Sequence, residues 1–471
     1  MSIALSTSTG RKALVASVIA SGMAFLDSTI VTVAAPRIEE DLGGGFAGMQ
    51  WVLDGYLLTL GSLVLVGGAL GDLLGKRRVF LVGTVLFAVA SALCGLAPNL
   101  PSLVAARMLQ GAAAALLVPT SLALLNAVFS GDDRGRAIGA WSGLSGVFTA
   151  LGPFIGGGLV DAFPFGWRLA FLINLPLAAA AIWFSRAAVP DLPGNRTNAP
   201  LVTQLDLAGA ALATVGLGLV IGPLIEIDQL GARAWVPVAV GVALLAVFTR
   251  VQVRRTKTGS PPPMVPTTLF SVRSFTVANL VTFVVYGALS AGVFLVTVFV
   301  QLAMGYSALA AGAAGLPITI LLALLSSRVG GLVSRWGPRW FLTLGPVVMA
   351  LGLVWLSTLA PGATYFGAVL PAMVVFAMGL VLVVAPVTTA ALRDIGGSQS
   401  GAASGVNNAV ARVAGLIAIA VLPAAAGITA SGAGLEEGFR SSMLMAAALC
   451  ATGGVIAAFG FGRHENAPHT Q

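Results

Sequence analysis

The sequence contains few of the residues on which most enzymes and soluble proteins depend. Only 9% of its 471 residues are charged, and it has two cysteines and two histidines. It contains no HExxH motif, no CxxC motif and no Walker-type phosphate loop. These absences argue against metal, thiol and ATP-driven chemistry. They predict that the chain is not an enzyme and has no cofactor and no metal site.

Hydrophobic residues take the place of the missing charge. They make up 57% of the chain, and the mean hydropathy is +0.97. A soluble protein of this length would need two or three cores, each covered by a charged surface. The composition does not supply that surface, so it indicates a chain that lies mostly in lipid.

Long apolar runs recur along the whole chain. Each reaches or approaches the roughly 20 residues that a helix needs to cross a bilayer. The runs are continuously apolar rather than alternating, so they predict helices and not a barrel. The chain is therefore predicted to be an all-α polytopic membrane protein. Its fourteen runs lie near residues 13–35, 51–71, 79–97, 101–129, 137–162, 168–187, 205–226, 235–251, 274–301, 307–331, 340–359, 365–391, 402–427 and 441–462.

Basic residues are unequally divided between the two sides of this topology. Loops rich in lysine and arginine stay cytoplasmic. With the N-terminus inside, the outer side receives only Arg37, Arg168, Arg233 and Arg440, and the other loop bases fall inside. This asymmetry predicts a cell inner-membrane protein with both termini in the cytoplasm. It also accounts for the net charge of +8 without a nucleic-acid partner.

An internal repeat indicates how the helices are grouped. The string Gly68–Arg77 recurs weakly 262 residues later as Gly330–Arg339, and both copies follow the second helix of a set of six. Paired halves of this kind are common in secondary transporters. The chain is thus predicted to comprise an N-terminal six-helix bundle (1–187), a two-helix insertion with flanking cytoplasmic loops (188–273) and a C-terminal six-helix bundle (274–471).

Five strings in a fixed order carry a family resemblance. They are Leu26–Val31 with Pro36, Gly68–Arg78, Leu103–Ala115 with Arg107, Gln110 and Gly111, Gly152–Gly157, and Trp167–Pro176. Over nearly its whole length the chain resembles the fourteen-helix drug:proton antiporters of the major facilitator superfamily. The resemblance implies the major facilitator fold and proton-driven export. Two departures are Phe148, where a small residue is usual, and Ser334, where the first loop copy has Asp72.

Two of these motifs suggest moving parts. The loop motif, with Gly68, Asp72, Gly75, Lys76 and Arg77, is implied by the family to be a conformational latch between the halves. Its alternative role is that of a basic loop which only sets topology. The antiporter helix motif places small residues at i, i+4 and i+5, where another helix can pack closely. The family resemblance implies a hinge or a seal that limits proton leak, and ordinary helix packing is the alternative. The residues of this motif are Gly152, Pro153, Gly156 and Gly157.

Ionisable residues inside the membrane are the sharpest indication of a site, because each is costly unless it faces a partner or water. Asp27, Asp54 and Arg107 are predicted to couple protons. Arg107 shares a helix face with Gln110, as Arg412 does with Asn408. The alternatives are a structural polar role for Asp27 or Asp54 and an interfacial anchor for Glu226. The candidates for the substrate cavity are Asp27, Asp54, Gln110, Glu226, Asn408 and Arg412.

The predicted function is exchange of protons for small amphipathic molecules, some of them cationic. A mostly apolar cavity with one or two carboxylates suits such substrates, and aromatic side chains could add cation–π contacts. Two alternatives remain: a proton-coupled symporter or uniporter of one metabolite, and a membrane sensor that transports nothing. The expected partners are a small-molecule substrate, protons and the lipid bilayer, and a monomer is compatible with each alternative.

Overall fold

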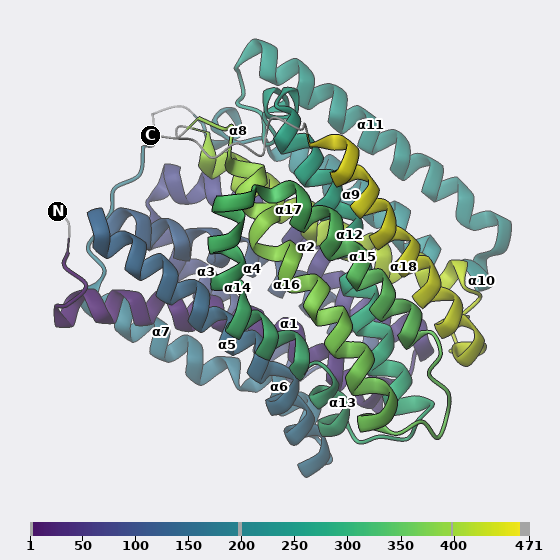
Figure 1. Cartoon of the computed structure of the whole chain (residues 1–471). Coiled ribbons are helices and arrows are strands. Elements are labelled where there is room, and N and C mark those ends of the chain that lie inside the picture. The colour runs from purple at the N-terminus through teal and green to yellow at the C-terminus, as the bar shows by residue number, and fades with distance from the viewer. Residues whose placement is uncertain (1–2, 196–199, 397–398, 462–471) are drawn as a thin grey trace. The chain divides into compact units, whose positions relative to one another are not determined.

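A computed structural model describes residues 3–195, 200–396 and 399–461, and within these ranges the chain is helical and contains no strand (Figure 1). Fourteen helical segments are long and apolar enough to cross a membrane, one for each predicted run. The all-α prediction is confirmed. Arg196, Arg463 and the C-terminal end, which enter the topology prediction, lie outside the described residues, as do both histidines and the side chain of Ser334.

Ten of the spans are single helices. These are α1 (Ser8–Leu42), α2 (Gly45–Leu74), α3 (Lys76–Gly95), α4 (Leu100–Val128), α5 (Gly131–Ala162), α9 (Leu207–Ile225), α12 (Arg273–Leu302), α15 (Pro338–Leu356), α17 (Ser400–Ala425) and α18 (Leu435–Gly460).

The other spans are interrupted. The sixth comprises α6 (Gly166–Leu172) and α7 (Asn174–Ala188). The eighth comprises α10 (Ile227–Leu230), η1 (Gly231–Ala234) and α11 (Trp235–Thr258). The tenth comprises α13 (Ala308–Ala314) and α14 (Leu316–Trp336), and the twelfth comprises η3 (Tyr365–Val369) and α16 (Leu370–Leu392). Short α8 (Leu201–Gln204) and η2 (Thr267–Ser271) lie in the connections.

Local capping explains why several helices are longer than their apolar runs. The Thr7 side chain accepts a hydrogen bond from the Gly10 backbone and starts α1 ahead of the run. At α4, Asn99 and Ser102 form a reciprocal capping box, and Pro101 sits in the first turn. Hydropathy detects the part of a helix in lipid, whereas caps determine where its hydrogen bonds begin.

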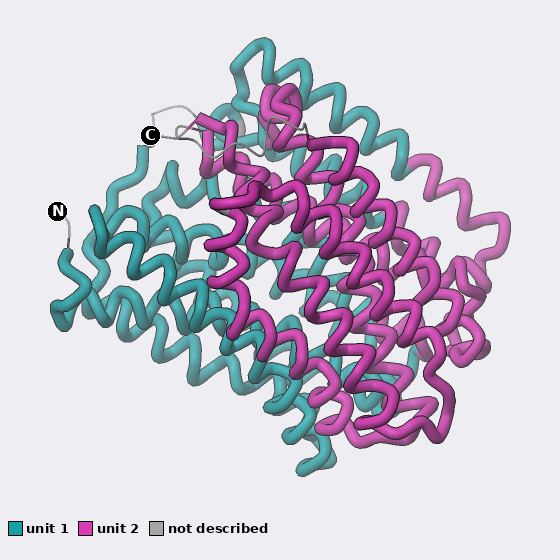
Figure 2. Tube along the Cα trace, in the orientation of Figure 1, with its two compact units in different colours: residues 1–44, 51–218, 241–264 teal, residues 45–50, 219–240, 265–471 magenta. Residues whose placement is uncertain are grey.

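Two compact units divide the chain (Figure 2). Unit 1 contains residues 1–44, 51–218 and 241–264, and unit 2 contains residues 45–50, 219–240 and 265–471. The divisions between them fall within α2, α9 and α11, so each helix of the inserted pair contributes to both units. The bundle boundaries at 187 and 273 remain a prediction.

Unit 1 is packed through small residues. Helix α1 lies against α4, α5 and α7, and α3 lies against α4. The core is rich in alanine and includes the buried rings of Tyr56, Phe80 and Phe87. A methyl group on Gly111 would overlap the Tyr56 carbonyl oxygen, so α2 and α4 approach backbone to backbone. Close approach of this kind is typical of helices that pack in lipid.

In unit 2, glycines likewise allow the backbones of α15 and α16 to approach each other closely. A side chain on Gly352 would lie 2.6 Å from the Phe376 backbone nitrogen, and one on Gly379 would overlap the backbone of Met349. Elsewhere α12 packs against α17 and α18. The Phe299 and Phe439 rings stack across the α12–α18 contact with centroids 4.1 Å apart.

Candidate proton-coupling site

Asp27 is completely buried in α1 and lies at the centre of a polar cluster in unit 1. Its Oδ2 accepts a hydrogen bond from Nη1 of Arg107 at 2.6 Å. Its Oδ1 accepts from Nε2 of Gln110 at 2.8 Å and from Nδ2 of Asn174 at 2.9 Å. Asp27 and its three hydrogen-bond donors therefore come from helices α1, α4 and α7. We call Asp27, Arg107, Gln110, Asn174 and Ser91 the Asp27 cage.

Arg107 is held on several sides. Besides the ion pair with Asp27, its Nη1 donates to Oε1 of Gln110 at 2.6 Å, and its Nε donates to the Val52 carbonyl of α2 at 3.0 Å. Its guanidinium carbon lies 4.4 Å from the centroid of the Tyr56 ring. A buried ion pair is tolerated where extra hydrogen bonds satisfy both partners. Arg107 and Gln110 lie on one face of α4, and both donate hydrogen bonds to Asp27 of α1.

Two members of the cage were not predicted from the sequence. Ser91 Oγ in α3 accepts from Gln110 at 3.1 Å and from Asn174 at 2.8 Å, and it donates to the Phe171 carbonyl at 2.9 Å. Asn174 lies in the Trp167–Pro176 motif, so a signal for it existed. A lone serine on a mostly apolar helix gives no comparable signal, because the same residue type often bonds only to its own helix.

Asp54 is a second buried carboxyl in unit 1, with 1% of its surface exposed. Among the described residues neither of its oxygens has a hydrogen-bond partner. It lies on α2, two residues from Val52 and two from Tyr56, both of which contact Arg107. A buried carboxyl without partners costs free energy, so Asp54 differs sharply from the satisfied Asp27.

The loop motif is held by its own neighbours in unit 1. Asp72 pairs with Lys76 at 2.7 Å, with 65% of the Asp72 side chain exposed. Gly75 has φ +98°, and a side chain there would lie 2.6 Å from the Leu192 carbonyl oxygen. The Asn195 N–H donates to the Asp72 carbonyl at 2.9 Å, and Arg77 donates to the Arg186 carbonyl at 3.4 Å. The segment after α7 therefore lies directly against this loop.

Within the antiporter motif, glycines let α5 approach α1 closely. A side chain on Gly152 would overlap Oγ1 of Thr29, and one on Gly156 would lie 3.0 Å from Cγ2 of Ile30. Gly157 is buried as well, and Pro153 lies inside the helix. Phe148, which stands where the family usually has a small residue, packs against Gly22 of α1. Its ring occupies the space that a side chain on Gly22 would need. Helix α1 thus accommodates the larger residue.

The remaining candidates belong to unit 2. Arg412 lies at the midpoint of α17 and donates from Nε to Oδ1 of Asn408 at 3.4 Å. The adjacent Asn407 donates to Asn279 at 3.2 Å and to Thr282 at 2.9 Å, which ties α17 to α12. Glu226 sits at the N-cap position of α10. The hydrogen bonds around Asp27 come from residues of unit 1.

Comparison with known proteins identifies the family of the chain. The family model of the Major Facilitator Superfamily matches residues 17–419. The chain is 35% identical over 408 residues to a probable actinorhodin transporter of Streptomyces coelicolor, covering 85% of this chain and 69% of the relative. It is 34% identical to the multidrug resistance protein Stp of Mycobacterium tuberculosis, covering 85% and 73%. With the cephamycin export protein CmcT of Amycolatopsis lactamdurans it shares 33% identity, covering 91% and 88%.

Solved structures resemble the fold at low sequence identity. The POT family transporter PepTSo superposes with a TM-score of 0.67 and 16% identity, covering 96% of this chain and 97% of that one. The chain therefore belongs to the major facilitator superfamily. It is a multi-pass membrane transporter of small molecules and not an enzyme, and the predicted fold class is confirmed.

Proposed function

We propose that this transporter exports small amphipathic molecules, some of them cationic, in exchange for protons. Its place would be the plasma membrane of a bacterial cell, with both termini in the cytoplasm. The names of the relatives support export, since they describe a cephamycin export protein, a multidrug resistance protein and a probable actinorhodin transporter. The single observation that carries proton coupling is the Asp27 cage.

The cage offers Asp27 two alternative ways of being neutralised. In the present geometry the Arg107 guanidinium supplies the compensating charge. A proton on Asp27 would replace that charge, and it would turn one carboxylate oxygen from an acceptor into a donor. Gln110 already accepts a hydrogen bond from Arg107, so it can retain the guanidinium when the pair loosens. Because α1, α4 and α7 each contribute, separating them changes access to the carboxylate.

Asp54 supplies the second carboxyl of the proposed pathway. Its two partnerless oxygens lie in the same helix that gives Arg107 a carbonyl and an aromatic face. In this scheme a proton moves between Asp54 and Asp27 when the helices admit water, and a substrate cation competes with it for the carboxylate. The positive charge of Arg107 compensates a negative charge on Asp27 or Asp54, so that no carboxylate is buried without a counter-charge.

The remaining motifs have supporting roles in the proposal. The antiporter helix motif keeps α5 sealed against α1 while protons occupy the cage, since its glycines leave little room between the helices. The loop motif favours one conformation of the transporter through Asp72 and the bases around it. In unit 2, Arg412, Asn408 and Glu226 are proposed to give the substrate polar contacts.

The driving force is sufficient for export. One charge crossing the membrane potential contributes about 2.3 kcal/mol per 100 mV, which sustains about a fiftyfold concentration ratio. No ATP-binding motif is required for a gradient of that size.

Transport in proteoliposomes with an imposed pH gradient tests the proposal. A panel of dyes, antibiotics and native metabolites should contain compounds that move against the direction of proton flow, and a protonophore should stop net accumulation. Movement in the same direction as protons would identify a symporter, and movement indifferent to the gradient would identify a uniporter. Ligand binding without any movement would favour a sensor.

A further inference from the structure

The exposed face of α11 carries basic residues in an unusual arrangement. Arg250, Arg254 and Lys257 follow one another at i, i+4 and i+7, a spacing that places them on one side of a helix. All three are exposed, and among the described residues none of their side chains has a hydrogen bond or ion pair. Helix α11 itself contains no acidic residue. The face therefore presents three uncompensated positive charges.

Unlike these three residues, the neighbouring Arg255 of α11 is mostly buried and forms an ion pair. Its guanidinium pairs with the buried Asp206, which also accepts a hydrogen bond from Gln252 at 2.5 Å and caps the start of α9 through the Gly209 N–H. Met264 donates its backbone N–H to the same carboxylate at 3.3 Å. One face of α11 is thus fixed to unit 1, while the opposite face is left with unpaired charge.

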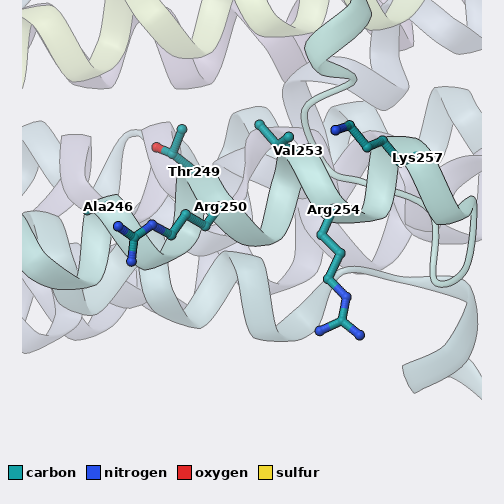
Figure 3. Close-up of a pocket in the computed structure, with 6 residues that line it drawn as sticks. All are labelled: Ala246, Thr249, Arg250, Val253, Arg254 and Lys257. Carbon is teal, nitrogen blue, oxygen red and sulfur yellow. The ribbon is translucent and has the colours of Figure 1, made fainter.

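An open groove of about 670 Å³ lies on this second face (Figure 3). It is lined by Arg250, Arg254 and Lys257 together with Ala246, Thr249 and Val253. In Figure 3 the Lys257 amine points toward Val253, the Arg250 guanidinium extends toward Ala246, and the Arg254 guanidinium projects away from the helix on the other side from Lys257. Positive groups and apolar groups therefore line the same groove.

Further along the same face the exposed side chains are apolar. Val242 precedes the residues that line the groove, Val247 lies between the lining residues Ala246 and Thr249, and both valines are exposed. In a membrane these positions meet acyl chains, and the basic side chains beyond them reach the headgroup level, where long cationic side chains extend to the interface. The succession of an apolar stripe and then a basic groove matches the succession of acyl chain and phosphate in one phospholipid.

We propose that this face of α11 binds the headgroup of an anionic phospholipid, with the guanidinium groups of Arg250 and Arg254 on the phosphate and the acyl chains along Val247 and Val242. Guanidinium groups bind phosphate through paired N–H donors. The proposal gives the inserted helix pair a function as a lipid-binding element. It stands independently of the direction of transport.

Binding of matched lipids to the purified full-length protein tests the site. Native mass spectrometry would compare phosphatidylglycerol with phosphatidylcholine of identical acyl chains, for the wild type and for the double variant Arg250→Gln, Arg254→Gln. Each basic residue near a membrane surface changes the binding of anionic lipid about fivefold. The preference for phosphatidylglycerol should therefore fall about thirtyfold in the double variant and about fivefold in Lys257→Gln.

The double variant Arg134→Gln, Arg136→Gln is the matched control, because it removes the same charge from exposed positions at the start of α5. It should keep the wild-type preference. An equal loss in the control would show a general charge effect, and an unchanged preference in the α11 variant would remove the site. Excess inorganic phosphate should not displace the lipid. Displacement by phosphate would reveal a simple anion site and contradict the lipid assignment.

Discussion

Asp72 is the residue at which the latch proposal can be tested with least disturbance to the fold. Its ion pair with Lys76 is solvent-exposed and contributes little stability. Asp72→Asn should therefore slow transport severalfold while leaving equilibrium ligand binding and thermal unfolding unchanged. Asp191→Asn, in the exposed connection after α7, is the control and should transport normally. Loss of binding together with normal turnover of the bound fraction would contradict the latch assignment.

Gly75 is a less informative position than the sequence suggests. Its φ of +98° disfavours any other residue, and a side chain would press on the Leu192 carbonyl. A bulky substitution there would disturb the loop itself, so its effect on transport could not be separated from misfolding. The structure thus shifts the test of this motif from Gly75 to Asp72.

The Asp27 cage shows what residue-level prediction can and cannot reach. Helical spacing was enough to place Arg107 and Gln110 on one face, because three residues make almost one turn. The distance between Asp27 and Arg107 depends on how α1 packs against α4, and residues 80 positions apart carry no spacing rule. The lack of partners at Asp54 likewise depends on its surroundings, which only the packed structure reveals.

At the scale of helices, α5 provides its own matched pair of glycines. Alanine at Gly152 would overlap Thr29 and press on the Leu26 carbonyl, whereas alanine at Gly158 meets open space. Gly152→Ala should cost about 1–3 kcal/mol through overpacking, and it should lower the unfolding midpoint and raise proton leak in proteoliposomes.

Gly158→Ala should leave the leak unchanged and should not lower the unfolding midpoint, because alanine favours the helix by about 1 kcal/mol over glycine. Equal behaviour of the two variants would show that the close contact between α1 and α5 has no special role in sealing the transporter.

The helices themselves were largely predictable, because a span in lipid must satisfy all its backbone hydrogen bonds internally. Each apolar run became a helical span. Interruptions such as Ile173 between α6 and α7 were not predicted. They arise from local backbone geometry within a continuously apolar stretch. Hydropathy does not change at the interruption, so it cannot reveal it.

At the scale of the whole molecule, the distribution of basic residues still makes a topology prediction. Reporter fusions after Lys257 and after Gln471 should both report a cytoplasmic location, since an even number of spans precedes each point. A periplasmic signal from either fusion would contradict the orientation or the number of spans that cross the membrane.

The internal repeat predicts two related halves, and that division remains a prediction; the two compact units have other boundaries. The sequence could not show that each helix of the inserted pair would be divided between them. The division of α9 and α11 between the two units depends on which helices each end packs against. The apolar residues of both helices look alike from end to end and give no sign of this difference. The repeat at Gly68 and Gly330 shows which sequence segments correspond to each other. It does not show to which compact unit the helices between them belong.

The central claim is that the Asp27 cage couples protons to export, and one comparison of variants tests it most directly. Asp27→Asn should be folded in the membrane but should abolish pH-gradient-driven export of cationic substrates in proteoliposomes and flatten the pH dependence of their binding. Asp191→Asn should retain both properties. Unchanged export by a well-expressed Asp27→Asn variant would contradict the account, and it would shift the coupling role to Asp54 or Glu226.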